Sequence, residues 1–150
     1  MKLGLIGLGK MGGNMRTRIR EAGHEVIGYD KNPDVTDVGS LAELVDQLTE
    51  SPRVVWVMLP IQFVTSTLEE LAPLLSPGDI VVDGGNSQWT WDHQHADQLG
   101  AQGIHFLDCG VSGGVWGVQN GYALMVGGDA DDVAVVQPTS RTGAAMPIWS

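Results

Sequence analysis

The sequence predicts an α/β protein with a doubly wound, mostly parallel sheet and helices on both faces. Short apolar runs typical of buried strands alternate with stretches that have helical periodicity. The connections between them are short, and a glycine-rich segment, residues 7–12, separates the first predicted strand from the first predicted helix. In such a sheet that segment lies at the carboxyl edge, where ligands bind.

The individual elements follow from these patterns. Strands are expected at residues 3–6, 24–29, 53–59, 79–83, 104–108 and 122–126, and helices at 11–22, 41–48, 64–75, 90–99 and from 131 to 136. Ser40 and Glu43 have the spacing of a capping box at the start of the second helix. Pro138 and the polar run after it are expected to end the last helix, with a frayed end beyond.

Composition and charge exclude several classes of function. A net charge of −10 argues against binding to nucleic acids or anionic membranes. The single cysteine, Cys109, rules out an internal disulfide and a multi-cysteine metal site, which favours a reducing compartment. We see no leader segment and no apolar run near the roughly 18 residues that a membrane helix needs. We therefore expect a cytoplasmic protein.

The segment Gly7-Leu8-Gly9-Lys10-Met11-Gly12 has the pattern of a phosphate-binding turn. Gly7 permits the sharp turn, Gly9 has no side chain to keep a pyrophosphate from the backbone, and Gly12 lets the helix pack close to the strand. Free amide hydrogens and the positive end of the helix dipole would then face the anion. The alternative is a glycine-rich turn that binds no ligand.

Asp30 supports the ligand-binding interpretation. It follows the second predicted strand and lies 23 residues after Gly7, where an acid that binds the adenosine ribose is found in dinucleotide-binding domains. Together these features predict a Rossmann-type domain. We expect residues 1–130 to form this dinucleotide-binding domain and residues 131–150 to be an unfinished or divergent C-terminal segment.

Three later motifs, in order, resemble those of the 6-phosphogluconate dehydrogenase family and, more broadly, the β-hydroxyacid dehydrogenases. They are Asp-Gly-Gly-Asn-Ser at 83–87, Gly-Val-Ser-Gly-Gly at 110–114 and Gly-Tyr-Ala-Leu-Met-Val-Gly-Gly at 121–128. The resemblance extends from Lys2 to about Asp129. Related hydroxyisobutyrate-type enzymes tend to have Asp-x-Ser-Thr at the first motif.

The resemblance implies a set of contacts with the cofactor and substrate. It gives Gly7, Leu8, Gly9, Lys10, Met11 and Gly12 to the pyrophosphate, Asp30, Lys31 and Asn32 to the adenosine ribose, and Leu59, Pro60 and Ile61 to the cofactor cleft. It places Asn86 between cofactor and substrate, and Ser112, Gly113 and Gly114 at the substrate's carboxylate and hydroxyl end. An amide such as that of Asn86 can both donate and accept hydrogen bonds. Roles in ordinary turns stay open for these residues.

The resemblance also implies residues that this sequence does not contain. In the family a lysine on a later helix, assisted by a glutamate, transfers the proton, whereas the only lysines here are Lys2, Lys10 and Lys31. No catalytic residue is therefore expected among the 150 residues; the family's lysine and glutamate would lie beyond Ser150. We expect a truncated or frameshifted reading frame, or an excised helical domain. Because that domain builds much of the family's homo-oligomer interface, the oligomeric state of this fragment stays open.

The expected function is the NAD(P)-binding part of an oxidoreductase that oxidises and decarboxylates 6-phosphogluconate to ribulose 5-phosphate, a step of the pentose phosphate pathway. The chain alone is expected to be inactive. The alternatives are another β-hydroxyacid dehydrogenase of the hydroxyisobutyrate type, or a non-catalytic dinucleotide-binding module. The Asp30 carboxylate would repel a 2′-phosphate, which favours NAD over NADP and leaves use of both open.

No metal site is expected. Asp92, His93 and His95 resemble metal ligands in type. On a helix, however, residues 93 and 95 point in nearly opposite directions and cannot share one ion. We expect these three residues to form a solvated helix face.

Overall fold

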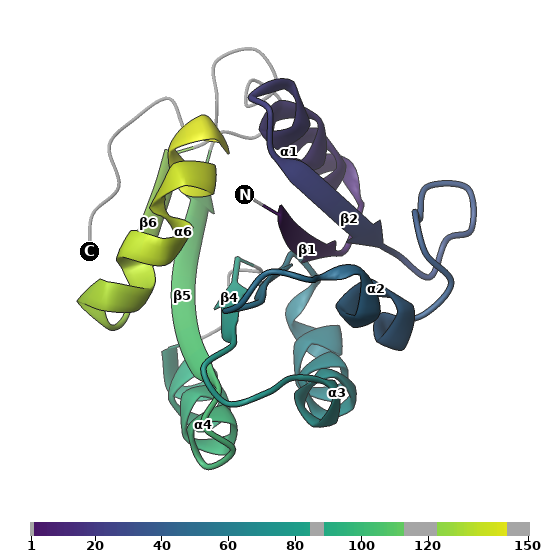
Figure 1. Ribbon diagram of the computed structural model, residues 1–150. Helices are drawn as coiled ribbons and strands as arrows, with labels where there is room; N and C mark the ends of the chain where they lie inside the picture. Colours follow the sequence, from purple (N-terminus) through teal and green to yellow (C-terminus); the bar gives the residue numbers. More distant parts are fainter. Residues whose placement is uncertain (1, 85–88, 113–122, 144–150) are drawn as a thin grey trace.

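The computed structural model describes residues 2–84, 89–112 and 123–143, and these form one sheet with helices on both faces (Figure 1). Its strands are β1 (Lys2–Ile6), β2 (Glu25–Tyr29), β3 (Val54–Val57), β4 (Ile80–Asp83), β5 (His105–Ser112) and β6 (Ala123–Gly127). Their order is β2-β1-β3-β4-β5-β6, in which β1 to β5 run parallel and β6 is antiparallel to β5. The predicted fold class is confirmed.

The helices alternate with these strands. They are α1 (Lys10–Glu21), α2 (Leu41–Gln47), α3 (Ile61–Leu71), the short 3₁₀ helix η1 (Ala72–Leu74), α4 (Trp89–Gly100) and α6 (Ala130–Gly143). The chain passes from β2 back across β1 to reach β3, so the winding direction reverses between β1 and β3. In open α/β sheets a ligand site forms outside the carboxyl ends of the strands at such a reversal.

Two apolar cores, one on each face, hold the helices on the sheet. Met15 and Ile19 of α1 pack with Val133 and Val136 of α6 on one face. On the other face α2, α3 and α4 pack against the sheet through buried leucines and valines, including Leu44, Leu68 and Leu99. All four residues of β3 are buried because both faces of this central strand are covered, as its continuous apolar sequence predicted.

The predicted start of α2 is confirmed with one difference. The Ser40 hydroxyl accepts a hydrogen bond of 3.1 Å from the Glu43 N–H, as an N-cap does. The Glu43 carboxylate, however, bonds to the N–H of Gly39 at 2.8 Å rather than to that of Ser40. The side chain therefore caps the turn one residue earlier than in a standard capping box.

Two elements extend further than the sequence predicted. β5 continues to Ser112 because its end pairs with β6, where Ser112 lies opposite Ala123. The prediction that Pro138 ends the last helix was wrong, because α6 continues to Gly143. A proline inside a helix removes one backbone hydrogen bond. Asp131 and Asp132 in the first turn and the buried Val133 and Val136 favour the helix despite that loss.

An arginine pair fixes the loop that follows β2. The Asp37 carboxylate binds Arg20 at 2.6 Å and Arg16 at 3.3 Å, both from α1, and accepts the Gly28 N–H at 2.8 Å. Burial alone would raise the pKa of Asp37, but the Gly28 hydrogen bond and the two arginine charges outweigh it and lower the pKa overall. These contacts hold residues 30–37 against α1, next to the glycine-rich turn.

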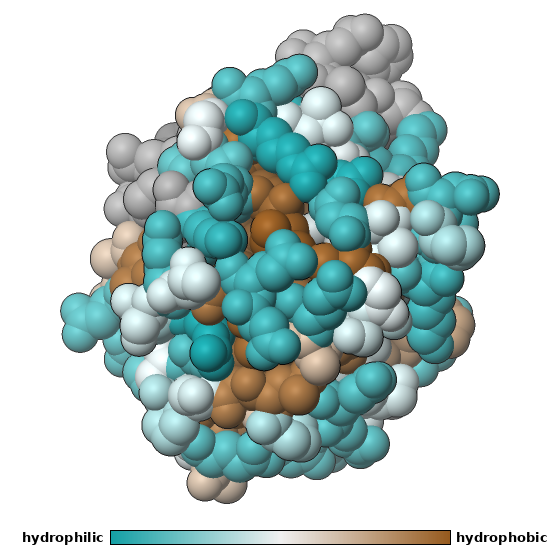
Figure 2. All heavy atoms as spheres, turned by 45° about the vertical axis from the view of Figure 1, so that its right-hand side comes forward, coloured by the Kyte–Doolittle hydropathy of each residue, from teal (hydrophilic) through white to brown (hydrophobic). Residues whose placement is uncertain are grey.

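The surface is largely polar where the structure describes it. Figure 2 shows a mainly hydrophilic face on which apolar atoms are visible between the polar side chains. Phe63, 47% exposed, is the large apolar residue that stands out among the described residues. None of the helices in the described ranges has the length and apolar character required to cross a bilayer.

The Asp37 contacts give a pH-dependent stability that can be tested. A carboxyl whose pKa is lowered on folding stabilises the fold fully above its ordinary value of 3.8 and loses that contribution as the pH falls through the folded-state pKa. We expect Asp37→Asn to lower the free energy of unfolding near neutral pH by about 1 kcal/mol. The difference from the wild type should shrink in acid. Urea unfolding across this range measures it, and parallel pH profiles would contradict the account.

Candidate dinucleotide-binding site

The turn after β1 has the geometry that its glycines predicted. Gly7 has a φ of +94°, which residues with a side chain rarely adopt. A Cβ at this position would also lie 2.5 Å from the carbonyl oxygen of Met58. The Gly7 N–H donates a 2.9 Å hydrogen bond to the Tyr29 carbonyl, which ties the turn to the end of β2. The backbone therefore turns sharply between three neighbouring strands.

Gly9 and Gly12 differ in what surrounds them. A Cβ on Gly12 would overlap the carbonyl oxygen of Gly7, so only glycine allows α1 to approach β1 this closely. A Cβ on Gly9 would have no atom of the described residues within 4 Å, so no contact with them requires a glycine there. A glycine in open space at a strand-to-helix turn fits a position where a ligand comes close to the backbone.

The start of α1 is suited to an anion. Gly9 is the N-cap of the helix, no side chain among the described residues caps its free N–H groups, and the first turn contains no acidic residue. The aligned peptide dipoles place a partial positive charge at this end. Lys10 is exposed beside it. A helix start of this kind offers N–H donors and positive charge of the sort that a pyrophosphate group requires.

Leu8 points into the protein, where its side chain is buried in the core, so it could contact a cofactor only through its backbone. Met11 packs against this core and stays partly exposed. The Leu8 N–H donates a 2.7 Å hydrogen bond to one oxygen of Asp30, and the other oxygen accepts the Asn32 N–H at 2.8 Å. Asp30 therefore links the glycine turn to the loop after β2.

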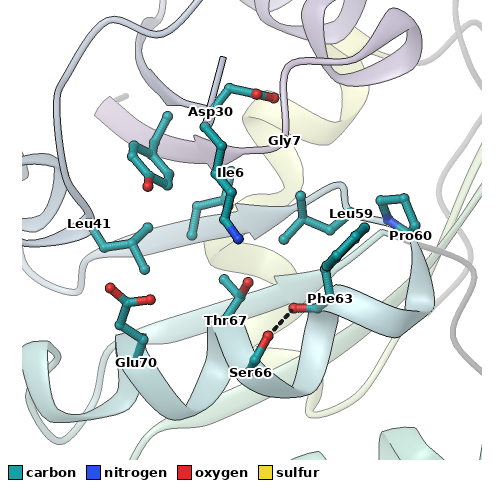
Figure 3. Close-up of a pocket in the computed structure, with 12 residues that line it drawn as sticks. Ile6, Gly7, Asp30, Leu41, Leu59, Pro60, Phe63, Ser66, Thr67 and Glu70 are labelled. Atoms are coloured by element: carbon teal, nitrogen blue, oxygen red, sulfur yellow. Dashed lines mark hydrogen bonds between the residues drawn. The ribbon is translucent and has the colours of Figure 1, made fainter. Parts of the chain in front are cut away.

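A hollow of about 230 Å³ opens beside this turn, between the end of β2, the start of α2 and one face of α3 (Figure 3). Its walls combine apolar, hydroxyl and charged side chains. They come from Ile6, Gly7, Tyr29, Asp30, Lys31, Leu41, Leu59, Pro60, Phe63, Ser66, Thr67 and Glu70. In Figure 3, Asp30 and Gly7 lie at one end, Leu59, Pro60 and Phe63 along one side, and Leu41 and Glu70 opposite.

The structure brings together many, but not all, of the predicted cofactor residues. Gly7, Asp30, Lys31, Leu59 and Pro60 line the hollow, and residues 8–12 adjoin it through the turn. Ile61 begins α3 and Asn32 closes a turn with the Asp34 N–H at 3.0 Å; neither lines the hollow.

The predicted substrate residues are not described in the same detail. Asn86, Gly113 and Gly114 lie outside the described residues. Ser112 is the last residue of β5, and its side chain is also outside them. Their roles stay predictions.

The contribution of α3 to the hollow was not predicted from the sequence. Phe63, Ser66, Thr67 and Glu70 line the hollow, whereas Val64 and Leu68, on the opposite face, are buried. The spacing of the buried residues could have identified the remaining face as available for a ligand. The Lys31 ammonium lies 5.8 Å from the centre of the Phe63 ring. The loop that follows β2 therefore contacts helix α3 across the hollow.

The expectation of a solvated helix face was wrong for His95, whereas the side chains of Asp92 and His93 lie outside the described residues. The His95 side chain is buried, and its Nε2 lies 3.0 Å from the Thr65 hydroxyl of α3. Burial lowers its pKa, and the negative charge of Asp83 opposes this only in part. Within the described ranges, no group of three or more potential metal ligands comes together.

Fold and site together define a Rossmann-type domain of the kind found in dehydrogenases. A sequence profile of the NAD binding domain of 6-phosphogluconate dehydrogenase matches residues 2–148, which extends past Asp129, where the resemblance of the motifs ended. The chain therefore belongs to the 6-phosphogluconate dehydrogenase family, of which these residues form the NAD binding domain.

Individual relatives agree with this assignment. The NAD(+)-dependent, decarboxylating 6-phosphogluconate dehydrogenase of Haloferax volcanii is 42% identical over 138 residues, which cover 85% of this chain and 45% of that protein. The chain spans about half, or less, of the length of the curated relatives that it matches.

Two solved structures share the fold. A Mycobacterium tuberculosis 3-hydroxyisobutyrate dehydrogenase has a TM-score of 0.86 at 28% identity, covering 98% of this chain and 53% of that one. A Plasmodium falciparum 6-phosphogluconate dehydrogenase has a TM-score of 0.90 at 24% identity, covering 97% and 34%. The second likeness is one of fold alone.

The different surroundings of the two glycines predict different mutant phenotypes. Gly12→Ala should destabilise the fold by about 3 kcal/mol, because the methyl group would collide with the Gly7 carbonyl. Gly9→Ala should change the unfolding free energy by less than about 0.5 kcal/mol and yet weaken dinucleotide binding. Thermal unfolding and calorimetric titration measure the two effects. Unchanged binding by a folded Gly9→Ala variant would contradict the assignment.

Proposed function

We propose that this chain is the NAD(P)-binding part of a decarboxylating 6-phosphogluconate dehydrogenase. The observation that carries the proposal is the open space at Gly9 beside an uncapped helix start that contains no acid, in a chain of this family. The N–H groups at the start of α1 would hold the pyrophosphate and the hollow would take the adenosine. The substrate is then a small molecule, and the proposed function requires no binding to nucleic acid or to a membrane. We also propose a cytoplasmic location.

The work of the chain's own residues is to bind and orient. When bound, the nicotinamide supplies the redox chemistry by accepting the hydride. Asp30 can accept hydrogen bonds from ribose hydroxyls through lone pairs that its contacts with Leu8 and Asn32 leave available. We further propose that Asn86 and residues 112–114 contact the sugar acid, as the family resemblance implies.

We propose that the chain prefers NAD to NADP. Asp30 and Glu70 both line the hollow, against the single cation of Lys31, so the lining is negative among the described residues. A carboxylate at about 4 Å from a 2′-phosphate costs roughly 1–4 kcal/mol, depending on the effective dielectric constant. The Haloferax volcanii relative, an NAD(+)-dependent enzyme, supports this choice. No metal is required for binding.

We also propose that the 150 residues by themselves bind the dinucleotide without turning over substrate. Lys2 pairs with Glu25 at 3.6 Å, Lys10 begins α1 and Lys31 faces Phe63, so all three lysines belong to the nucleotide-binding half. None matches the family's proton-transferring lysine, which lies on a later helix. Proton transfer would need residues that these 150 do not supply.

A second candidate substrate comes from the solved structures. The likeness to a 3-hydroxyisobutyrate dehydrogenase at 28% identity makes a smaller β-hydroxyacid the second candidate after 6-phosphogluconate. The Asp-Gly-Gly-Asn-Ser sequence at 83–87 weighs against it, since such relatives tend to have Asp-x-Ser-Thr there. A module that binds the dinucleotide and takes part in no reaction is the third possibility.

The cofactor preference is tested by titrating the chain with NAD and NADP in a calorimeter. The estimate above corresponds to NAD binding at least about fivefold more tightly than NADP. Raising the salt concentration should narrow the difference, because screening weakens the repulsion between Asp30 and the 2′-phosphate. Tighter binding of NADP at low salt would refute the preference.

The reaction is tested by following reduced nicotinamide at 340 nm in assays with 6-phosphogluconate and, separately, with 3-hydroxyisobutyrate. We expect neither to be oxidised by the 150 residues alone, while 6-phosphogluconate increases the affinity for NAD and 3-hydroxyisobutyrate does not. Turnover of 6-phosphogluconate would show that the proton-transfer residues are present after all. If only 3-hydroxyisobutyrate increased the affinity for NAD, the second candidate substrate would be supported.

A further inference from the structure

The face of α3 that lines the hollow changes character along its length. Phe63, at the first turn, is apolar, and Ser66, Thr67 and Glu70 follow it at the spacing that keeps them on one side of a helix. The Ser66 hydroxyl is already committed, because it donates a 3.2 Å hydrogen bond to the Phe63 carbonyl (Figure 3). Glu70 is the charged residue of this face and lies at its far end from Phe63.

Glu70 makes no hydrogen bond or ion pair with any residue in the described ranges. Figure 3 shows its carboxylate turned into the hollow toward Leu41. The cation of the lining, Lys31, lies over the Phe63 ring at 5.8 Å. Glu70 thus presents an exposed carboxylate to the space that a ligand would fill.

The ends of the hollow fix how an adenosine would lie. Gly7 and Asp30, at one end, are next to the pyrophosphate donors and the ribose position. Ile6, Leu41, Leu59 and Phe63 supply apolar walls suited to the flat faces of a base. A base between these walls directs its outer edge away from Asp30, along α3 and toward Glu70.

We propose that Glu70 is a specificity-determining residue that selects adenine by accepting a hydrogen bond from its exocyclic amino group. This inference rests on the proposed dinucleotide binding. An ionised carboxylate only accepts hydrogen bonds, so the base edge that faces it must donate. Adenine has an amino group there, whereas hypoxanthine has a carbonyl oxygen, whose lone pairs would face the negative charge.

The test compares the binding of NAD with that of nicotinamide hypoxanthine dinucleotide, which differs at this one group. In the wild type we expect NAD to bind about tenfold more tightly. In Glu70→Gln the amide can donate to the hypoxanthine carbonyl, so the ratio should fall to about twofold, chiefly because the hypoxanthine analogue binds more tightly. A loss of packing or of fold could not produce this gain.

Glu69→Gln is the matched control, because Glu69 is the neighbouring exposed carboxylate on α3 and does not line the hollow. It removes the same charge and should leave the wild-type ratio unchanged. An equal change in both variants, or an unchanged ratio in Glu70→Gln, would overturn the role of Glu70 while leaving NAD binding established. If neither dinucleotide bound the folded wild type, the proposed function and this inference would both fall.

Discussion

The site depends on the contact between the first turn of α1 and the end of β1. The Cα of Gly12 lies so close to the Gly7 carbonyl that no side chain fits between them, and Gly7 itself needs a positive φ. This contact directs the free N–H groups of α1 to the carboxyl edge of the sheet, where the chain winding reverses. The Leu8–Asp30 hydrogen bond then fixes the turn relative to β2. Backbone geometry, more than side-chain chemistry, forms the proposed anion-binding end.

A chain with a net charge of −10 can hold an anion because binding depends on local fields. The start of α1 has no carboxylate in its first turn, and the peptide dipoles give it positive character. The carboxylates of Asp30 and Glu70 line the hollow beside it. In the proposed binding mode, these acidic residues leave the pyrophosphate position free of negative charge and discriminate among the groups carried by the adenosine.

Much of the fold could be predicted from sequence because its signals are local. Apolar runs gave the strands, helical periodicity gave the helices, and the roles of Gly7 and Gly12 followed from steric limits that one motif expresses. Features that depend on distant contacts were missed. β5 extends to Ser112 only because β6 pairs with it, and His95 is buried because α3 covers it, with Thr65 as its partner.

The candidate site divides in the same way. Asp30 could be found from its spacing. Glu70 belongs to no motif, and it lines the hollow only because of the way α3 is oriented about its own axis. The Asp37 contacts with Arg16 and Arg20 likewise join residues whose proximity no local pattern expresses.

The central claim is that backbone amides at the start of α1 bind the diphosphate bridge of a nicotinamide dinucleotide. An NMR titration with NAD, following assigned backbone amide resonances, tests it most directly. The account predicts the largest shifts at Gly9, Lys10 and Met11, with smaller ones along the α3 face that lines the hollow. Saturable binding that left these three amides unshifted, or no binding by folded protein, would contradict it.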